Sequence, residues 1–219
     1  MHEFKVMELL YRELADYNVI SIGSGPLSLQ FVKKIAFRIV EEDLDVKVIP
    51  TSLKMAEILS SFKVPITSLN EREIDLAIEF VDRIDAKKNF VKLNSTSLIR
   101  DKMIGESASK LICICHKNDK VRRLNGKIDF EVSEFCLKRT QASLEKLGDS
   151  EIKKNGNRYF KTETGNPVIQ VDVHSIYSLT DIEFQAKKFA GVIETGLFLD
   201  CCDKAILFDK MGSANTIEF

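Results

Sequence analysis

The sequence has no excess of either charge and no long hydrophobic run, and both absences exclude classes of partner. Its 32 basic residues nearly balance its 33 acidic residues. It shows neither the basic stripe that binds nucleic acid nor the polybasic segment that binds anionic membranes. The longest apolar runs, such as Ala190–Leu199 with Glu194 inside it, are too short to span a bilayer. We therefore expect no nucleic-acid partner and no membrane association.

Cysteine and histidine are also scarce, which argues against a disulfide framework and a metal centre. Five cysteines, an odd number without framework spacing, indicate a reduced, cytoplasmic protein. The adjacent Cys201 and Cys202 could bind a metal or act in redox chemistry, but free cysteine usually behaves as a small hydrophobic residue. His2, His116 and His174 show no ligand spacing, and we expect them on the surface or in loops. We expect neither a metal nor another cofactor.

Helical and strand patterns alternate over the first 116 residues. The N-terminal helical pattern carries acidic residues among its apolar ones, unlike a signal peptide. The alternation predicts an α/β fold, a mostly parallel sheet covered by helices on both faces. The predicted helices are Phe4–Tyr17, Leu27–Glu42, a helix capped by Thr51-Ser52 that reaches about Phe62, and Ser97–Ser107; the predicted strands are Val19–Ile22, Val46–Ile49, Ile74–Ile78 and Leu111–Cys115.

The pattern changes after about Lys127. We predict a Rossmann-like catalytic domain over residues 1–127 and 196–219, with three α/β/α layers, and an inserted ferredoxin-like α+β subdomain over 128–195 that serves oligomerisation. Within or after the insertion we expect a strand at Ile128–Val132, a helix at Ser133–Leu147, an exposed loop at Gly148–Gly156, a hairpin of Asn157–Glu163 with Val168–Val173 turned by Gly165-Asn166, a helix at Leu179–Phe189, an extended Gly191–Glu194 and a last strand at Ala205–Phe208.

Carboxylates and a lysine are concentrated between residues 74 and 102. An apolar strand runs directly into Glu79 and Asp82, Lys92 follows ten residues later, and Asp101 comes nine after that. Ligands of parallel sheets bind outside the carboxyl ends of the strands, where Gly23 also ends a strand. Strand-end carboxylates beside a lysine and a third carboxylate form a constellation suited to acid and base chemistry.

This spacing resembles the signature of the type A ribose-5-phosphate isomerase family, which reads D-G-A-D, nine residues, K-G-G-G, and then a helix that carries R-E-K. Other segments are similar in the same order: VIPTSLKMAEILSSFKVPITSL, LICICHKNDKV, KTETGNPVIQV and GVIETGLF. The resemblance implies a homodimer or homotetramer. It also implies an aldose–ketose isomerase of the non-oxidative pentose phosphate pathway, which interconverts ribose 5-phosphate and ribulose 5-phosphate through an enediol without a metal.

The resemblance also implies catalytic roles. Asp101 takes the position of the family's glutamate base and is one methylene shorter. Glu79, one methylene longer than the family's aspartate, serves the substrate oxygens together with Lys92. Asp82 assists opening of the sugar ring. Charge is preserved at all four positions. The length of the side chain differs at two of them, being shorter at Asp101 and longer at Glu79.

The phosphate end departs further from the family pattern. The family's G-x-G-T-G-S-T loop is SIGSGPL here, where Pro26 lacks a backbone N–H and Leu27 replaces a hydroxyl. Phe80 and the run Leu93-Asn94-Ser95-Thr96 stand where the family has glycines, which allow close approach to a ligand. Ser24, Gly25 and Ser28, at the N-terminus of the following helix, could still bind the phosphate. The resemblance adds Lys5 and Lys120, onto which the family's basic contacts map.

Two alternatives remain open beside this isomerase, and a third is disfavoured. A catalytically impaired paralogue could bind a sugar phosphate or a protein partner, with Phe80 or Leu93 filling the pocket. An isomerase could act on a related sugar phosphate. Dinucleotide binding is disfavoured, because the Gly23–Ser28 segment only approaches G-x-G-x-x-G and Pro50-Thr51 stands where an acidic residue would follow the second strand.

Overall fold

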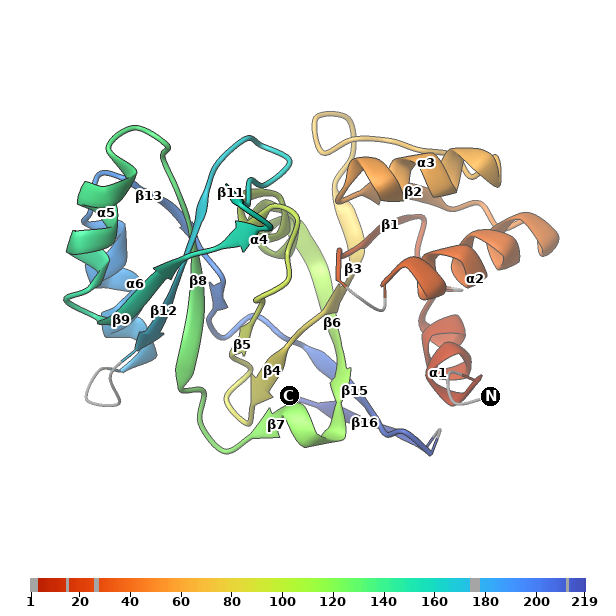
Figure 1. Cartoon of the computed structure of the whole chain (residues 1–219). Coiled ribbons are helices and arrows are strands. Elements are labelled where there is room, and N and C mark those ends of the chain that lie inside the picture. The colour runs from red at the N-terminus through yellow and green to blue at the C-terminus, as the bar shows by residue number, and fades with distance from the viewer. Residues whose placement is uncertain (1–3, 15, 26–27, 174–177, 212) are drawn as a thin grey trace.

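A six-stranded sheet forms the centre of the molecule (Figure 1). The computed structural model describes residues 4–14, 16–25, 28–173, 178–211 and 213–219. All neighbouring strands run parallel except the edge pair β15 and β16, which confirms the predicted mostly parallel sheet. In the order β16-β15-β6-β3-β1-β2, the strands span Ala214–Glu218, Lys204–Phe208, Ala108–His116, Ile74–Phe80, Val19–Ile22 and Lys47–Pro50.

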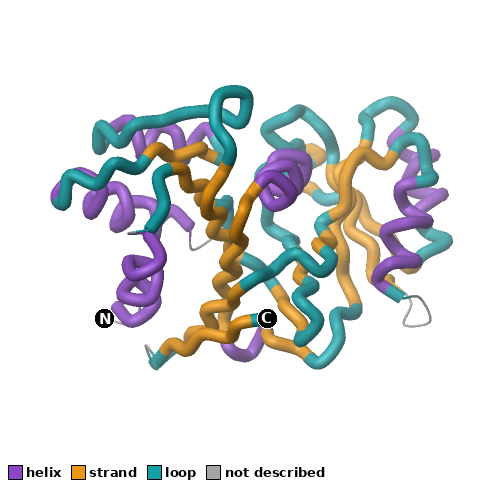
Figure 2. The backbone as a smooth tube through the Cα atoms, turned by 180° about the vertical axis from the view of Figure 1, so that it is seen from behind, coloured by secondary structure: helices purple, strands orange, loops and turns teal. Residues whose placement is uncertain are grey.

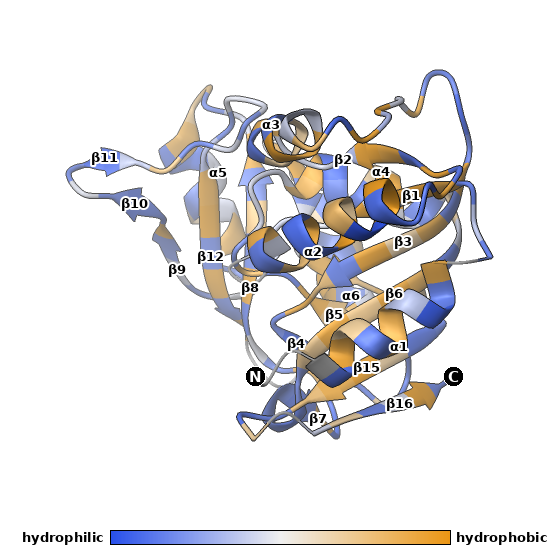
Figure 3. Cartoon of the chain, turned by 90° about the vertical axis from the view of Figure 1, so that its right-hand side faces the viewer, coloured by the Kyte–Doolittle hydropathy of each residue, from blue (hydrophilic) through white to orange (hydrophobic). Residues whose placement is uncertain are grey.

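Three helices cover one face of this sheet, at the right of Figure 1. They are α1 (Phe4–Leu14), α2 (Ser28–Glu41) and α3 (Leu53–Ser61). The helical period of α2 places Phe31 and Ile35 on a single stripe, and both are buried against the strands. Much of β3, β6 and β15 is hydrophobic (Figure 3), as expected for strands covered on both sides.

The opposite face is covered by one helix and a small sheet. Helix α4 (Leu98–Ser107) lies between the central sheet and a second large sheet (Figure 2). Beside it, the rings of Phe90 and Phe198 stack with centroids 4.4 Å apart. The sequence patterns did not indicate the small sheet, because its strands are too short to show a periodicity. In the order β14-β5-β4-β7, they span Leu197–Phe198, Phe90–Val91, Arg83–Asp85 and Lys120–Val121.

The second large sheet is antiparallel and carries both remaining α-helices on one face (Figure 1, left). Its strand order and connections match the βαββαβ arrangement of ferredoxin-like units. In the order β13-β8-β12-β9, the strands span Val192–Thr195, Gly126–Val132, Val168–Val173 and Gly148–Ile152, and the helices are α5 (Leu137–Leu144) and α6 (Leu179–Lys187).

Three expectations for the second half of the chain are wrong. Residues 148–152 form the edge strand β9 and not an exposed loop; Gly148 and Ile152 face inward while the acidic residues between them face solvent, as a polar edge strand allows. β9 therefore replaces 157–163 as the antiparallel partner of β12. The predicted turn residue Gly165 does have a positive φ, +85°. The strand that precedes it, β11 (Arg158–Tyr159), however, pairs with β10 (Lys154–Asn155) and not with β12. Strand β16 follows the strand that we expected to be the last.

None of the helices in the described ranges is long and apolar enough to cross a membrane.

Candidate active site

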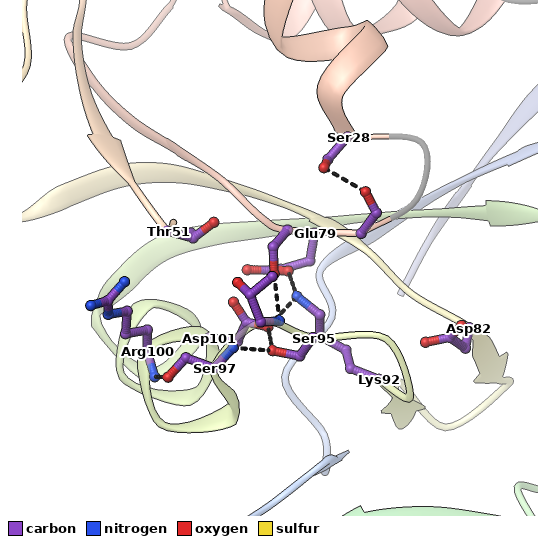
Figure 4. Close-up of polar contacts among 12 residues, drawn as sticks. Ser28, Thr51, Glu79, Asp82, Lys92, Ser95, Ser97, Arg100 and Asp101 are labelled. Carbon is purple, nitrogen blue, oxygen red and sulfur yellow. Dashed lines mark hydrogen bonds and ion pairs between the residues drawn. The ribbon is translucent and has the colours of Figure 1, made fainter. Parts of the chain in front are cut away.

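Three charged side chains meet in the interior beside the carboxyl end of the central sheet. Glu79 belongs to β3, Lys92 directly follows β5, and Asp101 lies in the first turn of α4. All three are at most 1% exposed. The Lys92 ammonium donates to Glu79 Oε2 and lies 2.6 Å from Asp101 Oδ2, between the two carboxylates (Figure 4). The structure therefore brings together three of the four predicted catalytic residues.

Gly23 allows the glutamate to occupy this place. The Gly23 N–H donates to the Ile78 carbonyl at 2.7 Å, so the end of β1 packs closely on β3. A Cβ atom at position 23 would lie 2.0 Å from Glu79 Oε2. Only glycine permits this approach without moving the carboxylate.

The local sequence before α4 orients the aspartate. Ser97 caps the helix by accepting from the Arg100 N–H at 3.3 Å. An acidic residue in the first turn, such as Asp101, is favoured by the positive end of the helix dipole. Ser95 donates to Asp101 Oδ2 at 2.6 Å and accepts from the Ser97 N–H at 2.9 Å. Sequence reasoning missed Ser95, although a hydroxyl residue just before a capped helix could have drawn attention to it.

Burial and mutual charge set the protonation of the cluster. Burial, opposed by the Lys92 ammonium and reinforced by the charge of Asp101, raises the pKa of Glu79 to about 8. Burial disfavours the charged form of Lys92, but Asp101 and Glu79 outweigh it and raise the lysine's pKa. The raised pKa of Glu79 favours its protonated form at neutral pH, and the raised pKa of Lys92 favours the cation.

Two oxygens of the cluster have no hydrogen-bond partner, Glu79 Oε1 and Asp101 Oδ1. Buried polar atoms are normally paired, and unpaired ones call for a functional explanation. An unpaired carboxylate oxygen can accept a proton, and a protonated carboxyl group can donate one. The arrangement can therefore move a proton between two positions on a small molecule.

A pocket of about 550 Å³ opens next to the cluster. Lys92 lines it, whereas Glu79 and Asp101 lie behind the lysine. Phe80 forms part of its wall, packed on Phe31 with centroids 5.2 Å apart, and Leu93 also contributes to the lining. Its remaining lining residues are Ser24, Gly25, Val81, Asp82, Arg83, Asn94, Ile114, Cys115, His116, Asp119 and Phe208.

Asp82 stands apart from the buried cluster (Figure 4). It lies on the pocket wall and accepts from the Leu93 N–H at 2.6 Å and from the Asn94 amide at 2.7 Å. These bonds fix the start of the loop that leads to α4. Asp82 is therefore available to a ligand in the pocket without contacting Lys92.

The predicted phosphate-binding residues are dispersed. Ser24 and Gly25 line the pocket, but the Ser28 hydroxyl donates to the Gly25 carbonyl at 2.7 Å. Lys5 and Lys120 are exposed and absent from the pocket lining, so their role in substrate binding stays a prediction. Pro26 and Leu27 lie outside the described residues, as do His2 and His174.

His116 and Asp119 occupy the pocket at the end of β6. We expected His116 at the surface or in a loop, but it is half-buried at the last position of the strand. Its Nδ1 accepts from the Asn118 N–H at 3.2 Å. Arg83 also lines the pocket, although its guanidinium donates to the carbonyls of Asn125 and Lys127.

The adjacent cysteines are packed against the central sheet. Cys202 is fully buried and donates to the Lys204 carbonyl at 3.2 Å. Burial raises the pKa of Cys201 to about 12, which disfavours the reactive thiolate. Across the described part of the chain, no group of three or more His, Cys, Asp or Glu residues could hold a metal ion.

Comparison with known proteins connects this geometry to a family. The family model described as "Ribose 5-phosphate isomerase A (phosphoriboisomerase A)" matches residues 47–212. Ribose-5-phosphate isomerase A of Bacillus mycoides is 30% identical over 201 residues, which cover 90% of each chain. Ribose-5-phosphate isomerase A 2 of Oceanobacillus iheyensis is 31% identical over 202 residues, covering 91% of this chain and 90% of its own.

Solved structures of isomerases share the whole fold. The ribose 5-phosphate isomerase from Plasmodium falciparum superposes with a TM-score of 0.88 at 22% identity, over 98% of both chains. A D-ribose-5-phosphate isomerase in complex with phospho-erythronic acid gives a TM-score of 0.87 at 23% identity, again over 98% of both chains. The chain belongs to the ribose 5-phosphate isomerase A family.

Proposed function

We propose that this chain interconverts ribose 5-phosphate and ribulose 5-phosphate, an aldose–ketose isomerisation in the non-oxidative branch of the pentose phosphate pathway. The observation that carries the proposal is the buried cluster of Glu79, Lys92 and Asp101 at the base of a pocket. Membership of the family supports it. The complex of a similar isomerase with phospho-erythronic acid also supports a sugar phosphate as the ligand.

Asp101 is the proposed base. The reaction moves a proton between adjacent carbons through an enediol, and a carboxylate placed over those carbons can carry it. Asp101 Oδ2 accepts from Ser95 and lies 2.6 Å from the Lys92 ammonium, whereas Oδ1 has no partner. We assign the proton transfer to Oδ1.

Lys92 and Glu79 are the proposed partners of the substrate oxygens. Negative charge develops on those oxygens in the enediol, and a cation in a water-excluded site stabilises it strongly. The protonated form of Glu79, favoured by its raised pKa, can donate a proton to one oxygen and recover it from the other. Asp82, on the pocket wall, is placed to assist ring opening before isomerisation.

Access to the base requires a local movement. Asp101 is fully buried behind the loop of residues 93–96, and Leu93 and Asn94 form part of the pocket wall. We propose that the sugar phosphate enters with its phosphate near Ser24 and Gly25. Leu93 and Asn94 at the pocket wall then shift, so that the sugar carbons reach Asp101 and the substrate oxygens take over part of the bonding of Lys92.

A second function is a non-catalytic, ligand-binding protein of the same family. The observation in its favour is the pocket wall, where Phe80, Leu93, Ile114 and Phe208 present apolar side chains and Asp101 is covered. Such a protein would bind a sugar phosphate without turning it over. Isothermal titration with ribose 5-phosphate, together with an assay of turnover, separates the two functions.

The decisive experiment is the isomerisation of ribose 5-phosphate by the purified chain in the presence of a metal chelator. We expect turnover by the wild type and a loss of about 10²- to 10⁴-fold in Asp101→Asn, which keeps the shape and removes the base. Asp149→Asn, an exposed aspartate on β9, is the matched control and should retain activity. A folded wild type that binds the sugar phosphate without turnover would contradict the isomerase and favour the second function.

Assembly and compartment complete the proposal. We propose a homodimer or homotetramer in which the subdomain of residues 128–195 provides an interface, since Phe135 and Phe184 are 84% and 59% exposed there. Size-exclusion chromatography with light scattering tests this assembly.

We propose the cytoplasm as the compartment, because all five cysteines are free thiols and a reducing compartment keeps them so.

A further inference from the structure

Ser95 has a hydroxyl group whose direction is fixed by its surroundings. The side chain is 8% exposed, and its Oγ accepts from the Ser97 N–H at 2.9 Å. The same oxygen lies 2.6 Å from Asp101 Oδ2. Since the backbone N–H can only donate, the serine proton is directed to the carboxylate (Figure 4). Ser95 therefore acts as a dedicated donor to Asp101.

The two donors to Asp101 converge on the same oxygen. Oδ2 receives the Ser95 hydroxyl and the Lys92 ammonium, each at 2.6 Å, while Oδ1 receives nothing. Two donors to one oxygen of the planar carboxylate restrict rotation of the group about the Cβ–Cγ bond of Asp101. This asymmetry leaves one oxygen in a defined position without a bound proton donor, which is the requirement for a base that must meet a C–H bond in one orientation.

The two donors are not equivalent once a substrate is present. Lys92 also donates to Glu79 and lines the pocket, so substrate oxygens compete for it. Ser95 does not line the pocket, and its second bond is to the backbone at the start of α4. It can therefore keep its bond to Asp101 while Lys92 turns toward the substrate.

We propose that Ser95 is a positioning residue of the isomerase, which holds the Asp101 carboxylate by Oδ2 so that Oδ1 faces the substrate carbons throughout the reaction. This inference rests on the proposed function, with Asp101 as base. Ser95 acts through Asp101 and does not contact the substrate. Its effect belongs to the chemical step and not to substrate binding.

The test compares Ser95→Ala, Ser95→Thr and Ser61→Ala with the wild type in steady-state assays. We expect Ser95→Ala to lower kcat about 10- to 100-fold, the loss typical of one hydrogen bond to a charged group, while KM stays within about 2-fold. Ser95→Thr keeps the hydroxyl and should recover most of the loss.

Ser61→Ala is the matched control, because the Ser61 hydroxyl donates to the Ile58 carbonyl in α3, away from the pocket. A Ser95→Ala protein with the kcat of Ser61→Ala would overturn the positioning role. So would a lower melting temperature with unchanged kinetics, because it would make Ser95 merely structural. A wild type without turnover would instead remove the isomerase itself, and the role of Ser95 with it.

Discussion

The buried charged cluster and the outer end of the pocket obey different constraints. In the cluster, Lys92 contacts both carboxyl groups, and Glu79 lies so close to Gly23 that no larger side chain fits at position 23. The outer end, formed by His116 and Asp119, carries an acidic side chain, and neither Lys5 nor Lys120, the two predicted phosphate-binding lysines, lines the pocket. The cluster is held by contacts among fully buried groups, whereas His116 and Asp119 are only half-buried. Chemistry is therefore the more constrained property of this protein, and substrate affinity the more adjustable one.

The largest expected effect comes from removing the central cation. Lys92→Met leaves Glu79 and Asp101 facing each other in the interior without a positive charge. Breaking a buried ion pair on one side costs about 3–5 kcal/mol of folding stability, and the substrate oxygens lose their cation as well. We expect no measurable turnover and a lower urea midpoint of unfolding. Lys54→Met, an exposed lysine on α3, should change neither.

The next effect comes from the glycine that faces the glutamate. Gly23→Ala puts a Cβ atom where Glu79 Oε2 lies, 2.0 Å away, and must displace the carboxylate. A shift of about 1 Å in a reacting group can cost ~10²-fold in rate, and we expect a fall in kcat of that order. Gly105→Ala is the matched control, since its added Cβ would lie 3.6 Å from the Phe198 ring, an ordinary contact. Equal kcat values for the two variants would show that the position of Glu79 does not govern catalysis.

The raised pKa of Glu79 gives a dependence on pH with a definite sign. Its ordinary value is 4.5, and burial raises it to about 8, so the folded protein binds this proton more tightly than the unfolded chain. The contribution to stability is complete below about pH 4.5 and is lost as the pH rises through about 8. The kcat/KM of the wild type should fall over the upper part of that range, because the proton donor ionises.

The variant Glu79→Gln distinguishes the pH dependence caused by Glu79 from that caused by other ionisable groups. Glutamine carries no ionisable proton, so the limb near pH 8 should disappear from both the urea-unfolding free energy and the kcat/KM profile. We expect a reduced but pH-independent activity between pH 7 and 9. A limb near pH 8 that persists in Glu79→Gln would assign it to another group.

The sequence predicted the cluster better than the outer end, for a physical reason. Glu79 lies near the end of the apolar strand β3 and Asp101 lies just after a helix cap, so both positions are set by regular elements with a readable period. The pocket wall includes Leu93 and Asn94 in a loop and Arg83 in β4, a strand of three residues. Such segments take their conformation from distant contacts, which a local pattern does not contain.

The same distinction explains which parts of the fold were predicted. Within the first 116 residues, the strands of the central sheet and the four helices bury apolar side chains, and they appear where expected. Strand β9 was missed because its sequence, GDSEI, carries polar residues on an exposed edge. Its register is set by β12, with Ile152 opposite Ile169, and not by its own composition. The sequence pattern identified elements that bury their own side chains and missed those stabilised by their neighbours.

The smallest expected effect lies at the outer end and tests how adjustable substrate affinity is. Asp119 lines the pocket, and its carboxylate opposes the approach of a phosphate dianion in a partly solvated site, where a unit charge a few ångströms away contributes on the order of 1 kcal/mol. Asp119→Asn should therefore lower KM for ribose 5-phosphate about 2- to 5-fold, with kcat unchanged and the gain reduced at high salt. Lys120→Gln, the neighbouring residue outside the pocket lining, serves as the comparison. If Lys120→Gln raised KM while Asp119→Asn had no effect, the phosphate would be held from the rim by Lys120, and the outer end would be as constrained as the cluster.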